Sequence, residues 1–260
     1  MIRILVVLVL LTLDLPAAEY SNADFVYSHG AVIRGPQTEK QIALVFTGGD
    51  FGDGGRHIRQ VLRRQRIKAT FFFTGDFYRN PDFGKVIEKL KKDGHYLGPH
   101  SDKHLLYCTW ENRDSLLVSR AEFSSDLLAN YAEMERFGIG REQPAYFMPP
   151  YEWYNDTIAV WAGEMGVTLV NYSPGTLSSA DYTIPSMKNY RSSEVVYKSI
   201  LDYEAKDPNG LNGFLLLTHI GTHADRADKF YNRLDELIRE LKTKGYSFIS
   251  IDQLLNRTGE

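Results

Sequence analysis

The sequence has almost no cysteine, no excess of basic residues and no glycine-rich nucleotide fingerprint. The single cysteine, Cys108, excludes an internal disulfide, so we expect it to be a small buried apolar residue. The formal net charge of −3 provides no basic surface for a nucleic acid, and we expect no nucleic-acid partner. No G-x-G-x-x-G pattern follows a predicted strand, which argues against a dinucleotide-binding fold.

The first residues have the composition of a secretory signal. A basic start at Arg3 is followed by an apolar run over residues 4–13 and by small residues up to Ala18. This order predicts a signal peptide over residues 1–18, cleaved near Ala17 or Ala18. A membrane anchor is the alternative, but the run is short and Asp14 interrupts it. We therefore expect export to the periplasm or the cell exterior, without stable membrane insertion. The sequence does not define the oligomeric state.

The rest of the chain alternates apolar runs with helical periodicity. Residues 19–40 are expected to form an irregular N-terminal extension, and residues 41–260 one domain. The main predicted strands are 42–46, 69–73, 145–148, 168–172, 214–218 and 248–251, and the predicted helices are 57–64, 83–92, 116–137, 157–164, 193–204 and 230–241. A strand followed by a helix, repeated about seven times, predicts an α/β fold: a distorted (β/α) barrel of about seven parallel strands.

Two histidines four residues apart make the stretch from Gly94 to His104 the strongest chemical signal. A short strand-like segment ends at Gly98-Pro99, so His100 and His104 are expected on a loop at the C-terminal tip of a strand. Neutral imidazoles at this spacing can converge on one divalent ion, of which Zn²⁺ is the usual choice. The alternative is that one histidine caps the turn and the other is an ordinary surface residue.

Other polar groups follow the other predicted strands. These groups are Thr47-Gly48-Gly49-Asp50, Pro149-Pro150-Tyr151, Asp181 and His219. In a parallel barrel all strand tips share one face, so these groups are expected to meet the two histidines. Two histidines with a carboxylate form a metal site with an open position, and a further histidine can act as general acid. Such a set supports hydrolysis by metal-activated water.

Three segments carry a family resemblance. Residues 68–75 read KATFFFTG, residues 94–104 follow G-H-x-x-G-x-H-[ST]-x-x-H, and residues 215–219 end in an L-x-H pattern. The chain resembles the polysaccharide deacetylases of carbohydrate esterase family 4, the NodB-homology group, over residues 42–255. This resemblance implies a distorted (β/α) barrel, a bound divalent metal and removal of N- or O-acetyl groups from a carbohydrate substrate.

The chain departs from the family at its first and third motifs. Where the family reads T-F-D-D-G, Thr47 occupies the position of the catalytic-base aspartate and Gly48 that of the metal-binding aspartate. Met148 occupies the position of the arginine that holds the base. Loss of the base and the arginine together is electrostatically coherent, since loss of one alone leaves an unpaired charge.

The resemblance also implies roles for the remaining residues. Asp50 is the nearest carboxylate to the lost ligand, so we expect it to bind the metal with His100 and His104; the alternative is that it only caps a turn with Asp53 and Gly54. Asp50, Asp53 or a metal-bound hydroxide is the candidate base.

His219 matches the general acid, and the backbone N–H of Tyr151 matches an oxyanion donor. Asp181 is the candidate carboxylate that orients His219, although the family's D-x-x-x-W pattern is absent there.

The expected function is a metal-dependent deacetylase of a polysaccharide or oligosaccharide, in which zinc, nickel or cobalt suits the histidine and carboxylate ligands. One alternative is a catalytically silent barrel that binds carbohydrate. Another is hydrolysis of a non-acetyl amide or ester bond. The sequence does not identify the glycan.

Overall fold

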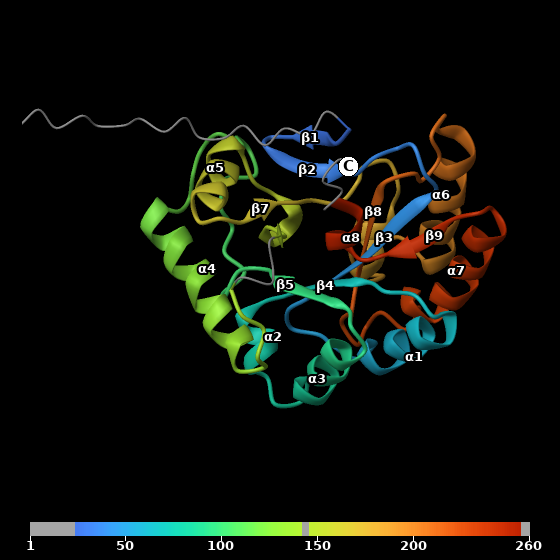
Figure 1. The fold of residues 1–260 in the computed structure, drawn as a ribbon, viewed down its shortest axis with the longest axis horizontal. Helices are drawn as coiled ribbons and strands as arrows, with labels where there is room; N and C mark the ends of the chain where they lie inside the picture. Colours follow the sequence, from blue (N-terminus) through green and yellow to red (C-terminus); the bar gives the residue numbers. More distant parts are fainter. Residues whose placement is uncertain (1–23, 142–145, 256–260) are drawn as a thin grey trace, which may run out of the picture.

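The computed structural model describes residues 24–141 and 146–255, so the predicted signal peptide lies outside the described residues. Within these two ranges, no helix has both the length and the apolar character needed to cross a membrane. The polypeptide forms a curled sheet with helices packed around its outside (Figure 1).

The centre of the sheet is β3 (Gln41–Gly48), which pairs in parallel with three other strands. One side of β3 pairs with β8 (Phe214–His219), and β4 (Thr70–Phe73) and β9 (Ser247–Ile249) pair with its later and earlier residues. Beyond β4 lies β5 (Tyr96–Pro99), also parallel. Seven successive residues of β3, 42–48, are buried, as expected for a parallel strand covered on both faces.

Two short strands complete the curl of the sheet. The pair β6 (Tyr146–Phe147) and β7 (Thr168–Leu169) is parallel and joins the main sheet near β5 on one side and near β2 on the other. The Met148 N–H donates to the Pro99 carbonyl at 3.3 Å, and Val32 forms a parallel bridge with Val170. The predicted α/β fold with a distorted barrel is therefore confirmed.

The prediction of an irregular segment over residues 19–40 is wrong for its described part. Strands β1 (Val26–Ser28) and β2 (Ala31–Arg34) form an antiparallel hairpin, and β2 pairs with β8 through Arg34 and Phe214. The Arg34 guanidinium also donates to the Gly210 carbonyl at 2.8 Å. The strands are too short to show a clear alternation in the sequence, and the partner strand β8 lies far along the chain.

The helices surround the sheet, and the six that the sequence predicts lie close to their predicted positions, whereas the short helices over residues 75–79 and 251–255 were not predicted. They are α1 (Gly55–Gln65), α2 (Gly75–Arg79), α3 (Gly84–Lys92), α4 (Arg120–Glu135), α5 (Asp156–Glu164), α6 (Ser193–Lys206), α7 (Leu234–Thr243) and α8 (Ile251–Leu255), with 3-10 helices at Pro150–Glu152, Ser178–Tyr182 and Phe230–Arg233. The predicted helix 116–137 begins later, at Arg120, because Ser119 and Glu122 form a capping box there. Cys108 is a free, buried cysteine, as predicted.

Candidate active site

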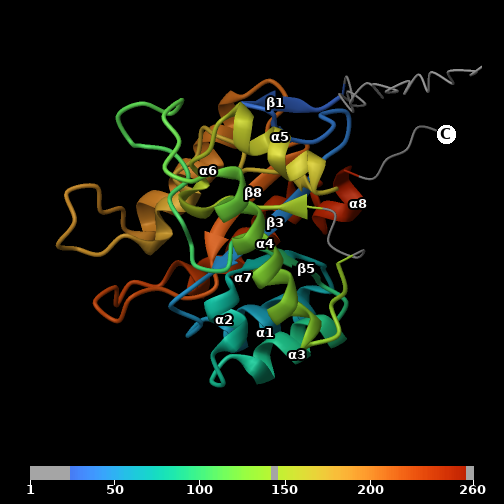
Figure 2. The same cartoon turned by 90° about the vertical axis from the view of Figure 1, so that its left-hand side faces the viewer.

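The register of the sheet brings the predicted strand tips together. Thr47 is paired with His219 on one side and with Phe72 on the other. The next residue, Gly48, pairs with Phe73, which in turn pairs with Pro99 immediately before His100. The ends of β8, β3, β4 and β5 thus lie side by side at one edge of the sheet. Long loops project from the molecule on the left of Figure 2, on the side where these strands end.

His100 is held in one orientation by two hydrogen bonds. Its Nδ1 lies 2.8 Å from the carbonyl oxygen of Met148. Its backbone N–H donates to Asn130 Oδ1 at 2.8 Å. A carbonyl only accepts, so Nδ1 carries the proton and the Nε2 lone pair is free to bind a metal ion.

His104 lies beside His100, with 5.0 Å between the ring centroids. The ring of Tyr151 also contacts His104, with 4.3 Å between the ring centroids. Burial lowers the pKa of His104 to about 4, and burial together with the neighbouring His104 lowers the pKa of His100 well below its usual value. Both imidazoles are therefore neutral at pH 7, the form that binds a divalent ion. The donor chemistry of this pair fits such an ion.

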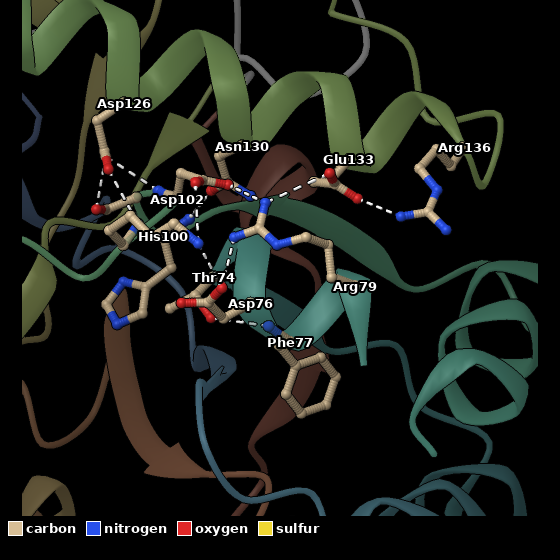
Figure 3. Close-up of polar contacts among 12 residues, drawn as sticks. Thr74, Asp76, Phe77, Arg79, His100, Asp102, Asp126, Asn130, Glu133 and Arg136 are labelled. Carbon is tan, nitrogen blue, oxygen red and sulfur yellow. Dashed lines mark hydrogen bonds and ion pairs between the residues drawn. The ribbon is translucent and has the colours of Figure 1, made fainter. Parts of the chain in front are cut away.

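The histidine loop, residues 100–104, is held in place by helix α4. The Asp126 carboxylate accepts hydrogen bonds from the Ser101 hydroxyl at 2.6 Å and from the backbone N–H groups of Asp102 and Lys103 at 3.0 and 2.9 Å. Figure 3 shows Asp126 and Asn130 pointing from the same helix toward the loop. These contacts hold a backbone in which Ser101 and His104 both have positive φ, an unfavourable conformation for residues with side chains.

A second group of charges ties the loop to helix α2. Arg79 donates to the Asp102 carboxylate at 2.6 Å and lies 3.4 Å from Glu133 of α4 (Figure 3). Gly75 allows the close approach that this requires, because a Cβ there would lie 1.7 Å from Asp102 Oδ1. The histidine loop is therefore clamped between two helices.

His219 forms the second cluster of the site with Asp181. Its Nδ1 lies 2.6 Å from Asp181 Oδ1, and its backbone N–H donates to Asp181 Oδ2 at 3.0 Å. Burial lowers the pKa of His219, but the charge and hydrogen bond of Asp181 and the charge of Glu152 outweigh burial, so the pKa is raised. This arrangement favours the imidazolium form that a general acid requires.

The third part of the site, at the end of β3, holds little polar structure. Thr47 is buried, and its hydroxyl has no hydrogen-bond partner within the described residues. Gly48 has no room for a side chain, since a Cβ would lie 2.7 Å from Ile220 and 2.9 Å from Phe73. Asp50 is exposed, and its charge acts on the pKa of His104. Over residues 24–141 and 146–255, no group of three histidine, cysteine or acidic side chains is arranged so that it could bind one metal ion.

Asp53, the next carboxylate, is occupied by structural contacts. It accepts hydrogen bonds from the Thr222 N–H and the Tyr231 hydroxyl, each at 2.8 Å, and Lys229 Nζ lies 3.1 Å away. Burial raises the pKa of Asp53, but these contacts outweigh burial and lower it. Such a carboxylate is a weak base.

The third motif adopts a strained turn. Tyr151 and Glu152 have φ values of 58° and 52°, two consecutive left-handed residues without glycine. The ring of Tyr151 is partly exposed beside His104, and within the described residues its backbone N–H donates to no other backbone group. Each such residue costs about 1–2 kcal/mol, a strain that the surrounding fold must hold.

Sequence reasoning missed Asp126, Asn130 and Glu152. The first two were detectable, since they lie four residues apart within the apolar stripe of a predicted helix, where polar side chains need partners. Glu152 directly follows the Pro-Pro-Tyr turn, but its neighbourhood with Asp181 and His219 arises only from the tertiary fold.

The fold and the site together define a barrel hydrolase of the carbohydrate esterase type. The sequence profile described as polysaccharide deacetylase matches residues 34–170, more than half of the chain. The chain belongs to the polysaccharide deacetylase family. Its class of reaction is the hydrolysis of acetyl groups on carbohydrates, and members of this family depend on a divalent metal ion.

The known proteins similar to the chain include a relative in sequence and solved structures that share its fold. A peptidoglycan-N-acetylglucosamine deacetylase of Bacillus cereus is 28% identical over 221 residues, covering 85% of this chain and 90% of the relative. The solved structure of the peptidoglycan N-acetylglucosamine deacetylase Bc1960 has a TM-score of 0.69 at 22% identity, covering 88% of this chain and 94% of the other. A family pseudoenzyme from Bacillus anthracis has a TM-score of 0.68 at 19% identity, covering 88% of this chain and 70% of the other.

Proposed function

We propose that this protein removes N-acetyl groups from the amino sugars of peptidoglycan. The observation that carries the proposal is the pairing of two neutral, fixed imidazoles with an Asp181–His219 pair at one edge of the sheet. Relatives named for peptidoglycan-N-acetylglucosamine deacetylation support the choice of substrate.

In this proposal His100 and His104 hold a divalent ion, for which zinc is the first choice and nickel or cobalt the alternatives. A bound ion would lower the pKa of water and polarise the acetyl carbonyl. Asp50 would supply the third protein ligand. It follows two glycines and is exposed near His104, so local backbone rotation can bring its carboxylate inward.

His219 would donate a proton to the leaving amine. Asp181 fixes its tautomer, because Nδ1–H donates to the carboxylate and Nε2 is left to face the substrate. The Tyr151 N–H would stabilise the negative charge on the carbonyl oxygen as water attacks. Asp50 is the candidate base that replaces the carboxylate absent at Thr47.

The direct test is acetate release from N-acetylated peptidoglycan by the metal-loaded protein. We expect release that stops when a chelator removes the ion and returns when the ion is restored. A zinc-loaded, folded protein that binds peptidoglycan but releases no acetate would contradict the proposal.

That outcome would favour a second candidate, a catalytically silent barrel that binds glycan. Specific observations favour this candidate: Thr47 and Met148 are uncharged where the family has its base and arginine, and Gly48 has no space for a ligand side chain. Release of a group other than acetate would instead indicate hydrolysis of another amide or ester.

We also propose that the protein is exported after cleavage near Ala18. The basic start and the apolar run of residues 4–13 support this proposal. N-terminal sequencing of the mature protein should begin near Ala18 or Glu19. An intact Met1 terminus in the soluble cytoplasmic fraction would contradict export.

A further inference from the structure

A cavity of about 430 Å³ lies beside the candidate site, and no role has been assigned to it so far. Its lining includes Tyr151, Glu152, Trp153, Asn171, Tyr182 and Asn189. Its volume is within the range of pockets that bind small ligands, roughly 300–1,000 Å³. Aromatic faces and side-chain amides suit the apolar faces and hydroxyls of a sugar ring.

The pocket is adjacent to both histidine clusters. The ring of Tyr151 on its wall contacts His104, with 4.3 Å between the ring centroids, and the ring centroid of Tyr182 lies 5.2 Å from that of His219. A ligand in this pocket would therefore lie next to the reacting sugar rather than at a remote surface.

Glu152 is an unpaired carboxyl group in this pocket. Within the described residues its carboxylate makes no hydrogen bond and no ion pair. Its backbone groups are engaged: the carbonyl accepts from Asn171 at 3.0 Å and the N–H donates to the Pro149 carbonyl at 3.1 Å. Burial raises the pKa of Glu152 to about 7. The charge of His219 lowers this pKa and the charge of Asp181 raises it, and both effects are smaller than that of burial. A carboxylate without a partner is unfavourable in such a place, and a cation bound beside it would stabilise its ionised form.

The other charged side chain of the pocket does not neutralise Glu152. The Arg113 guanidinium lies over the ring of Trp153, 3.8 Å from its centroid, and forms no ion pair with Glu152. The charges that act on the pKa of Glu152 are those of His219 and Asp181. Glu152 therefore lies at the end of the pocket nearest the candidate general acid.

We propose that this pocket binds a sugar unit that carries a free amino group, whose ammonium pairs with the Glu152 carboxylate. The inference rests on the proposed function, since removal of an N-acetyl group produces such a unit. The protein would then prefer glycans that are already partly deacetylated, with a deacetylated sugar seated beside the next one to react.

The test compares two trimers that contain no acetyl group: β-1,4-linked glucosamine, and cellotriose, which has a hydroxyl in place of each amine. Calorimetric titration of the wild-type protein should show about five- to tenfold tighter binding of the glucosamine trimer, the worth of one charge-assisted contact. This preference should shrink as salt is added.

Glu152→Gln should remove the preference while binding of cellotriose is unchanged. Glu111→Gln is the matched control, because Glu111 is exposed, lies next to Trp110 and does not line the pocket. It should keep the preference. Equal affinity of the wild type for both trimers, no binding of the glucosamine trimer, or a preference that survives Glu152→Gln would each overturn the proposal. If Glu152→Gln does not fold, equal affinity of the wild type for both trimers would still overturn the proposal.

Neither trimer releases acetate, so this result is independent of the deacetylase assay. Acetate release without any preference for the glucosamine trimer would contradict the proposed role of the pocket and leave the proposed function intact. A Glu152-dependent preference without acetate release would keep the pocket and reject the proposed function.

Discussion

The two loops that frame the candidate site differ in how the rest of the molecule holds them. The histidine loop receives hydrogen bonds and ion pairs from helices α2 and α4, whereas the loop after β3, residues 49–54, leaves its first carboxylate exposed. The first loop keeps the family pattern and the second has lost it. The comparison teaches that one side of a site can stay firmly held while its other side has lost the family's side chains.

The largest expected effect is loss of the metal. His100→Ala combined with His104→Ala removes both imidazoles. Asp50, the third proposed ligand, cannot retain an ion alone, because catalytic zinc usually has three protein ligands. Metal analysis of the purified, folded double variant should find no stoichiometric ion. Undiminished metal content would show that the histidine loop is not the binding side.

The next effect concerns proton transfer by His219. His219→Ala should keep the metal and lower acetate release by about 10²–10⁴-fold, the usual contribution of a positioned acid. Asp181→Asn should lower the His219 pKa, which Asp181 raises in the wild type. If the reaction needs the imidazolium form of His219, the alkaline limb of the pH–rate profile of Asp181→Asn should therefore shift to lower pH. Near-normal turnover in His219→Ala would remove it from the mechanism.

Asp126→Asn tests the clamp on the histidine loop. An amide nitrogen cannot accept, so at least one of three donors loses its partner, at a cost of about 1–3 kcal/mol in the free energy of unfolding. Denaturant unfolding measures this change, and metal affinity should fall as the loop loosens. Asp202→Asn, on the exposed face of α6, is the matched control and should change neither quantity. Equal stability of the two variants would refute the clamp.

Asp50→Asn tests the other side of the comparison. Asp50 is exposed, so the free energy of unfolding should stay within about 0.5 kcal/mol of the wild type. If Asp50 completes the ligand set, zinc affinity should fall about tenfold or more. Unchanged zinc affinity in a competition titration would show that another group, or water, fills that position.

The last comparison is between two adjacent glycines, of which the second, Gly49, has the smallest expected effect. Gly48→Ala forces a methyl group against Ile220 and Phe73 and should destabilise the fold by about 1–3 kcal/mol. Gly49→Ala meets nothing nearer than the Thr74 methyl at 3.6 Å and should leave stability unchanged or slightly higher. Thermal unfolding of the two variants should show this order, and a stable Gly48→Ala would mean that the end of β3 can still accept a ligand side chain.

Much of the fold was predictable because its signals are local. The apolar runs at β3, β4 and β8, and the periodic helices α3 and α7, lie within a few residues of their predicted positions. The hairpin of β1 and β2 was not predicted, since its stability comes from pairing with a strand about 180 residues away. The two histidines were recognisable by spacing, but the Asp126 and Asn130 contacts that orient them join segments 23–30 residues apart.

The sequence by itself determined the family, the strand and helix order, and the residue types available for chemistry. Only the tertiary structure decided which charges meet: Asp181 with His219, Asp126 with the histidine loop, and Asp53 with Lys229. It also leaves the Glu152 carboxylate without a partner among residues 24–141 and 146–255. The physical reason is that hydrophobic periodicity is written along the chain, whereas the burial and pairing of a charge depend on segments that the fold brings together.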